Sequence, residues 1–550
     1  MEPEAEPRSY WRRWSKQDFF PEPTFQNFTS YLEALSSTPS LLKDRFLNRS
    51  TDSFELLHLP KQSENHMKRC LSWWDLVWLS FGSVVGSGIF VIIGQATLQA
   101  GPAIVLSYAI SGLSALLSVF CYTEFAVEIP AVVGAAGVGR SWSSYFASII
   151  NTNTNLLRIS VQSLPHGFNL LDPIAVVVIL VANVITVSGT SRTSMLNWIT
   201  SIASAAVIVF IIAVGFVHGK TSNLEPFFPY GAEGVFKASA LVYWSYTGFD
   251  LVATMAEEVK QPSRDIPVGL IGSMSLITMI YCLMSLGLVM MQKYTQISAD
   301  VAYSVAFKAI GMNWAKYLVS ICALKGMTTS LLVCSLGQAR YTTQIARAHM
   351  IPPWFALVHP KTGTPIYATI LVTITSAVVA LFSSLEILSS VYSFSTLAIF
   401  MLVAIALLVR RYYVRDVTPR NDLAKFLTSL FVIVGSSIGL AALWNANVRG
   451  WIWYVVAACI WLLGTLWMAL LPKQRAAKVW GVPLVPCLPS LSIGINIFLI
   501  GSLGYLAFLR FAVCTAVMVV YYLLVAVHAT YDVAHQIDQQ ESRTEVGNAS

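Results

Sequence analysis

Long apolar runs with few charges alternate with short polar segments along the chain after residue 70. The runs have 15 to 28 residues, and about 20 apolar residues in a helix cross the hydrocarbon core of a bilayer. The pattern therefore predicts an all-α membrane protein with about fourteen transmembrane helices. The predicted spans are residues 73–96, 102–129, 131–150, 173–187, 196–217, 237–255, 267–291, 314–337, 365–382, 388–409, 426–444, 451–471, 491–508 and 511–527. The third is the weakest, because it consists of small residues around Arg140.

Two of these runs contain segments that predict an interrupted helix. They are Phe81–Phe90 in the first span, with three glycines and two serines, and Tyr243–Asp250 in the sixth. The hydrocarbon region offers no other partner for backbone groups that a break sets free, so breaks belong beside a polar cavity. Close packing of helices through small residues is the alternative explanation. Broken first and sixth spans predict two inverted five-helix repeats, each beginning with a broken helix, which is typical of secondary transporters.

Composition and charge exclude several classes of protein. The chain is 55% hydrophobic and only 11% charged, and its Lys and Arg residues lie beside the spans, so its net charge of +7 does not indicate binding to nucleic acid. Eight cysteines and eight histidines follow no metal-ligand spacing. We therefore expect no metal, no other cofactor and no enzymatic activity.

The loops after the even-numbered spans collect the basic residues, which is typical of cytoplasmic loops. These residues are Lys260 and Arg264, then Arg340, Arg347 and Lys361, then Arg410, Arg411, Arg415, Arg420 and Lys425, then Lys473, Arg475 and Lys478. If the weak third span crosses the membrane, both termini are cytoplasmic. We expect a cytoplasmic tail over residues 1–70, a transport core over 71–410, a four-helix extension over 411–528 and a second cytoplasmic tail over 529–550.

Short motifs along nearly the whole chain resemble those of one family. They are Gly86–Phe90, Phe120–Phe125, Gly248–Asp250, Met255–Glu258, Arg264–Pro267, Leu324–Thr328, Gly337–Tyr341, Ala346–Met350 and Lys361–Pro365. Together they resemble plant cationic amino acid transporters of the amino acid/polyamine/organocation superfamily. The chain departs from the family pattern where Glu128-Ile129-Pro130 passes almost directly into Val133-Gly134. The resemblance implies that the preceding loop and the first half of the third helix are missing there, together with a glutamate that relatives place near the substrate.

The resemblance implies a substrate site between the two broken helices. Backbone N–H groups at Gly86, Ser87 and Gly88 would take the carboxylate of the amino acid, and carbonyls of the sixth span would take its ammonium. Half-helix N-termini favour anions and unwound carbonyls favour cations, which agrees with this assignment. The predicted substrate-binding residues are Gly86, Ser87, Gly88, Ile89, Tyr246, Thr247, Gly248 and Phe249. Phe249 is interpreted as a gate over the substrate, with ordinary packing as the alternative.

Three further residues concern selectivity or coupling. The resemblance places Ser204 at the position in span five where some proton-coupled relatives carry Lys or His, and a serine does not titrate near neutral pH. Asp250 and Lys325 are ionisable groups deep within spans, where they serve substrate selection, proton coupling or a structural ion pair. Protons as a coupling ion and voltage-driven uptake therefore both stay open, since a cation gains about 2.3 kcal/mol per 100 mV on entering a negative-inside cell.

The expected function is secondary active or facilitative transport of amino acids by alternating access. Arginine and lysine are the expected substrates, with neutral or acidic amino acids as further ones. A non-transporting or regulatory truncated isoform is the alternative. We expect a multi-pass protein of the lipid bilayer in the plasma membrane, with the vacuolar membrane as the alternative.

Overall fold

The computed structural model describes residues 19–45, 72–124, 132–152, 154–161, 163, 165, 168–187, 193–249, 259–359, 364–414, 417–448, 450–475 and 480–535. This part of the chain is almost entirely helical. Its only strands are β1 (Ile159–Ser160) and β2 (Leu170–Leu171), which form a small antiparallel pair with Ile159 opposite Leu171.

Each of the fourteen predicted spans overlaps a helix. The α-helices are α2 (Phe28–Lys43), α4 (Trp73–Ala100), α5 (Ile104–Glu124), α6 (Val132–Ile149), α7 (Pro173–Val187), α8 (Thr193–His218), α9 (Gly231–Val242), α11 (Pro262–Met291), α12 (Ala302–Ala309), α13 (Asn313–Arg347), α14 (Ile366–Phe382), α15 (Leu385–Tyr412), α16 (Arg420–Asn445), α17 (Trp451–Leu470), α18 (Cys487–Ser502) and α19 (Tyr505–Tyr521). Within the described residues, seven helical stretches are long and apolar enough to cross a bilayer, and four shorter apolar helices accompany them. The all-α membrane class is thus confirmed.

Short 3-10 turns and one π-helical turn complete the described elements. They are η1 (Pro23–Phe25), η4 (Gly101–Ala103), η5 (Thr154–Leu157), η6 (Thr221–Leu224), η7 (Tyr243–Tyr246), η9 (Tyr294–Gln296), η10 (Pro353–Ala356) and the π-helical η11 (Tyr522–Ala526).

The boundary between the last two helices differs from the prediction. The apolar pattern predicts a break near residues 509–510, whereas α18 ends at Ser502 and α19 begins at Tyr505. The reason is Gly504, whose φ of 86° lies in the left-handed region that favours glycine. The backbone turns at this glycine, although apolar residues continue on both sides of it.

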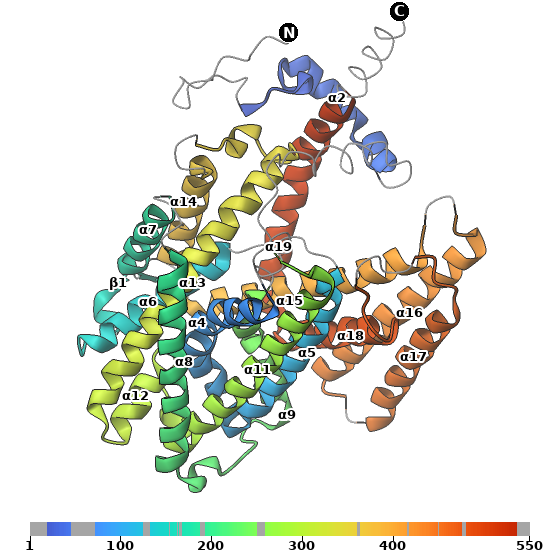
Figure 1. Ribbon diagram of the computed structural model, residues 1–550. Coiled ribbons are helices and arrows are strands. Elements are labelled where there is room, and N and C mark those ends of the chain that lie inside the picture. The colour runs from blue at the N-terminus through green and yellow to red at the C-terminus, as the bar shows by residue number, and fades with distance from the viewer. Residues whose placement is uncertain are drawn as a thin grey trace, which may run out of the picture.

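The helix α4 lies in the centre of the core (Figure 1). It packs against α9, η7, α11 and α13, while α5 packs on the other side of α9 and α11. A second group, formed by α6, α7, α13 and α14, packs together beside it. One continuous cluster of buried apolar side chains runs through these helices, so the centre of the bundle is a packed core around α4.

The C-terminal helices extend the molecule to one side. Figure 1 shows α16 and α17 side by side at the periphery, in contact with α18, and α18 in turn packs on α15 and α5. A second buried cluster, which includes Leu407, Phe426 and Ile493, joins α15, α16 and α18. The extension is therefore attached to the core mainly through α18.

An ion-pair network explains the arginine in the weak third span. The guanidinium of Arg140 on α6 is buried and donates hydrogen bonds to the carbonyl oxygens of Ser383 and, at 2.7 Å, Leu170. The Asp172 carboxylate lies 3.9 Å from Arg140 and 3.2 Å from Arg158, and Arg158 lies 3.7 Å from Asp300. Paired charges can be buried at a tolerable cost, so α6 keeps an arginine inside the bundle.

The N-terminal residues 19–45, which we call the strap, lie across the end of the bundle where α19 and its continuation finish (Figure 1). Tyr31 donates to the carbonyl of Leu524 at 3.1 Å, and the backbone N–H of Thr24 donates to the Asp532 carboxylate at 3.0 Å. On the core side, the buried carboxylate of Glu22 lies 2.7 Å from Nδ1 of His349. The strap therefore connects the loop after α13 to the C-terminal helix, and both ends of the described chain lie on one side of the bundle.

Candidate functional site

The sixth span is broken at the predicted place. The helix α9 ends at Val242, the 3-10 turn η7 follows, Thr247 is extended with ψ of 154°, and Gly248 has φ of 113°. Thr247 closes the turn, because both its backbone N–H and its hydroxyl donate to the Trp244 carbonyl at 3.1 and 2.7 Å. An interruption is thus present within the predicted segment Tyr243–Asp250, although Asp250 itself lies outside the described residues.

The first span differs from the prediction, because α4 is one continuous helix from Trp73 to Ala100. The N–H groups of Gly86, Ser87 and Gly88 therefore lie inside a helix and not at the N-terminus of a half-helix. A glycine weakens a helix by only about 1 kcal/mol relative to alanine, and in a bilayer the helical hydrogen bonds are the available partners for the backbone. The expected break at these residues is wrong for this structure.

Close packing explains one of the glycines in α4. The Ser245 hydroxyl of η7 donates to the Gly88 carbonyl at 2.9 Å. A Cβ at Gly88 would lie 2.4 Å from the Ser245 carbonyl oxygen and 2.5 Å from Oη of Tyr281. Gly88 is thus the point at which the backbones of α4 and η7 touch, so the alternative explanation of small residues as packing residues holds here.

Three large side chains of the predicted site are packed in the bundle. Tyr246, Phe249 and Ile89 are each 0% exposed, and the Tyr246 hydroxyl donates to the Tyr108 carbonyl at 2.7 Å. The Phe249 ring stacks on Phe400 with ring centroids 5.1 Å apart and an interplanar angle of 21°. In this structure Phe249 is a packing residue, and a gating role would require it to leave this stack.

A narrow pocket opens beside α4, between α8 and α13. It is lined by Phe81, Gly82, Val85 and Phe90 of α4, by Ser204 and Ile208 of α8, and by Cys322, Lys325 and Gly326 of α13. The volume of the pocket is about 20 Å³, which is room for about one water molecule. This pocket reaches the helix that carries the predicted carboxylate-binding residues, and Lys325 is the ionisable cation in its lining.

Two of the predicted residues, Ser204 and Lys325, are in contact within this pocket. Nζ of Lys325 donates to the Ser204 hydroxyl at 3.5 Å, across 121 positions of sequence. Among the described residues, no carboxylate lies within ion-pair distance of Lys325. A lysine from α13 therefore stands beside the span-five position at which this chain carries a serine.

Sequence reasoning missed two further residues at this place. Tyr281 of α11 approaches the carbonyls of both α4 and η7, and the Tyr392 hydroxyl of α15 donates to the Thr247 hydroxyl at 3.2 Å. No local sequence pattern distinguishes a tyrosine that donates a hydrogen bond to another element from a tyrosine that only fills the core. Only the packing of α11 and α15 around η7 reveals them.

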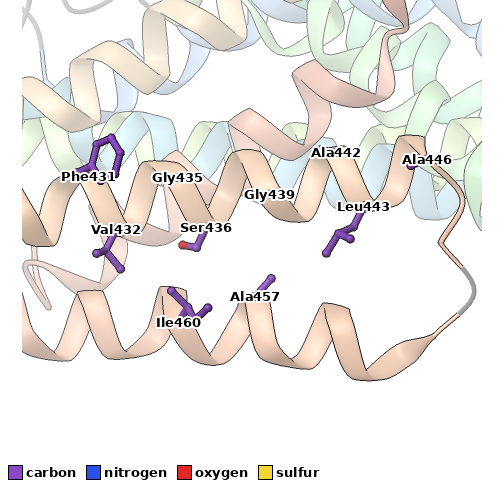
Figure 2. Close-up of a pocket in the computed structure, with 10 residues that line it drawn as sticks. All are labelled: Phe431, Val432, Gly435, Ser436, Gly439, Ala442, Leu443, Ala446, Ala457 and Ile460. Atoms are coloured by element: carbon purple, nitrogen blue, oxygen red, sulfur yellow. The ribbon is translucent and has the colours of Figure 1, made fainter.

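The larger cavity shown in Figure 2 lies between α16 and α17, away from these residues. Its lining consists of Phe431, Val432, Gly435, Ser436, Gly439, Ala442, Leu443, Ala446, Ala457 and Ile460. Its volume is about 700 Å³, and the Ser436 hydroxyl is its one polar side chain. An amino acid needs partners for two charged groups, so this cavity does not fit one.

Comparisons with known proteins find matches along most of the chain. The amino acid permease family matches residues 71–465, and the C-terminal region of amino acid permeases matches residues 480–530. From Arabidopsis thaliana, "Cationic amino acid transporter 8, vacuolar" is 66% identical over 96% of this chain and 94% of that protein. "Cationic amino acid transporter 5" is 59% identical over 97% and 99%, and "Cationic amino acid transporter 1" is 50% identical over 94% and 93%.

Proposed function

This chain belongs to the amino acid permease family, and we propose that it transports cationic amino acids such as arginine and lysine. It is a multi-pass membrane transporter of amino acids and not an enzyme. The observation that carries the proposal is the broken segment of the sixth span, held directly against α4. A truncated, non-transporting isoform is not favoured, because the three relatives that match nearly the whole chain are named as transporters.

The proposed substrate site lies between α4 and the break after η7. Carbonyls of Tyr246, Thr247 and Phe249 are the partners for the substrate ammonium, since an extended segment leaves carbonyls outside the helical pattern. The carboxylate binds at Gly86, Ser87 and Gly88 only if α4 opens there. Glycines lower the cost of that opening, so we propose that substrate binding and the opening of α4 occur together.

Lys325 is proposed as the residue that couples transport to protons or selects the substrate. A serine at position 204 cannot change charge near neutral pH, whereas the lysine beside it can lose a proton when it is desolvated. The proposal is supported by the pocket that Lys325 lines together with residues of α4. Proton coupling through Lys325 is therefore the proposal, and voltage-driven uptake without protons is the alternative.

The membrane and the orientation also belong to the proposal. The name of the 66% identical relative includes "vacuolar", whereas the names of the next two state no membrane. Imaging the chain with a fluorescent protein fused at its C-terminus distinguishes a location in the plasma membrane from one in the vacuolar membrane. The basic loops after even spans support cytoplasmic termini.

The function is tested with purified protein in liposomes, which removes the question of the cellular membrane. We expect saturable uptake of radiolabelled arginine under a negative-inside potential, with competition by lysine. An inward proton gradient without a potential separates proton coupling from voltage-driven uptake. If inserted, correctly folded protein carries no arginine or lysine under either condition, the proposed cationic specificity is wrong.

A further inference from the structure

One tyrosine joins the two elements of the proposed substrate site. Tyr281 of α11 is 0% exposed, and its hydroxyl lies 3.1 Å from the Val84 carbonyl oxygen of α4 and 3.1 Å from the Ser245 carbonyl oxygen of η7. The hydroxyl has one proton and faces two carbonyls, so it forms a shared hydrogen bond between them. Val84 lies two positions before Gly86, and Ser245 lies directly before Tyr246.

The position of this hydroxyl is fixed by its surroundings. The Tyr281 ring packs against the rings of Tyr246 and Tyr108, with centroids 5.3 and 5.5 Å away, and all three residues are 0% exposed. A Cβ at Gly88 would lie 2.5 Å from the Tyr281 oxygen, so glycine at that position leaves just enough room for it. The hydroxyl, α4 and η7 therefore meet at one point without space for a further side chain.

We propose that Tyr281 is a positioning residue that holds the broken segment of the sixth span against α4. It thereby sets the separation between the carbonyls that receive the substrate ammonium and the residues that receive the carboxylate. This inference rests on the proposed function, since it concerns the same substrate site. The competing explanation is that Tyr281 only fills space in the core, which a phenylalanine would do equally well.

The substitution Tyr281→Phe keeps the ring and removes the hydroxyl, which leaves two buried carbonyls without this donor. We expect the KM for arginine to rise about fivefold, as for the loss of one ordinary hydrogen bond, while Vmax per inserted protein stays within about twofold. Tyr303→Phe is the matched control. Tyr303 is also 0% exposed and packs on Phe90 of α4, but its hydroxyl has no hydrogen-bond partner within the described residues.

A second measurement does not depend on the substrate. Hydrogen–deuterium exchange of peptides that cover residues 243–249 should be faster in Tyr281→Phe than in Tyr303→Phe, because the segment has lost its hydrogen bond to α11 and keeps only the bond from Ser245 to Gly88 as its direct link to α4. Unchanged exchange would overturn the inference, and so would faster exchange with an unchanged KM for the substrate carried. If the unsubstituted protein carries no arginine, the proposed specificity fails, while the exchange result still decides whether Tyr281 holds the segment.

Discussion

The substitution Gly88→Ala tests the contact between α4 and η7 most directly. The added Cβ would lie 2.4 Å from the Ser245 carbonyl oxygen and 2.5 Å from the Tyr281 hydroxyl, and both distances are shorter than real Cβ contacts. One of these neighbours is backbone and the other is a tyrosine fixed between two buried rings. Neither can move aside without separating η7 from α4.

The free-energy cost of Gly88→Ala follows from these contacts. An extra methyl group in a packed site costs about 1 to 3 kcal/mol, and loss of the hydrogen bond from Ser245 to the Gly88 carbonyl adds about 1 kcal/mol. We expect this loss of about 2 to 4 kcal/mol to fall mainly on the substrate-binding arrangement, because the clash lies there. At about 1.4 kcal/mol per factor of ten, the KM for arginine should rise at least tenfold.

The assay is arginine uptake into liposomes together with the Tm of the purified protein. Gly272→Ala on α11 is the control, since a Cβ at Gly272 would meet nothing within 4 Å and alanine favours the helix. The control should leave KM unchanged and Tm unchanged or higher. Wild-type KM and Tm in Gly88→Ala would refute the close contact between α4 and η7 as the basis of the site.

Three further predictions concern charged groups. Lys325→Gln should abolish the pH dependence of arginine uptake, and Lys325→Arg should do the same because arginine keeps its charge. A wild-type pH profile in either variant would contradict proton coupling through this residue. Glu22→Gln should make the strap more sensitive to limited proteolysis, since its partner His349 loses the carboxylate, whereas Glu33→Gln on the exposed face of α2 should not; equal cleavage of both variants would refute this role. Asp172→Asn leaves two arginines without their shared carboxylate and should lower the free energy of unfolding by about 3 to 5 kcal/mol, measured as loss of folded protein. Asp422→Asn, in a surface ion pair, should change the free energy of unfolding by less than about 1 kcal/mol. Equal effects of the two substitutions would show that the buried network is not stabilising.

The helices of this fold can be predicted from the sequence because the apolar runs are long and the bilayer sets their length. Helix breaks are less predictable, since they depend on contacts with residues far away in the sequence. Around Thr247 and Gly248 the backbone leaves the helix, whereas around Gly86–Gly88 it does not, although both segments contain glycine. Tyr281 donates to a carbonyl in each segment, and no local sequence pattern assigns it to either.

The site shows the same limit. Sequence motifs predicted the two central segments and the two residues Ser204 and Lys325, but not that these two side chains meet. Their positions are 121 residues apart, on helices whose contact is decided by the packing of the whole bundle. Residues 250–258, which include the candidate Asp250, lie outside the described part of the chain.

The strap has a consequence for following the transport cycle by spectroscopy. It contacts His349 after α13 on one side and Asp532 near the end of the chain on the other, so it fixes the distance between a core helix and the C-terminal helix. A pair of fluorophores on α2 and at the end of the C-terminal helix would show constant energy transfer while the strap is seated. A change in that transfer during turnover would report detachment in real time, without any label inside the membrane.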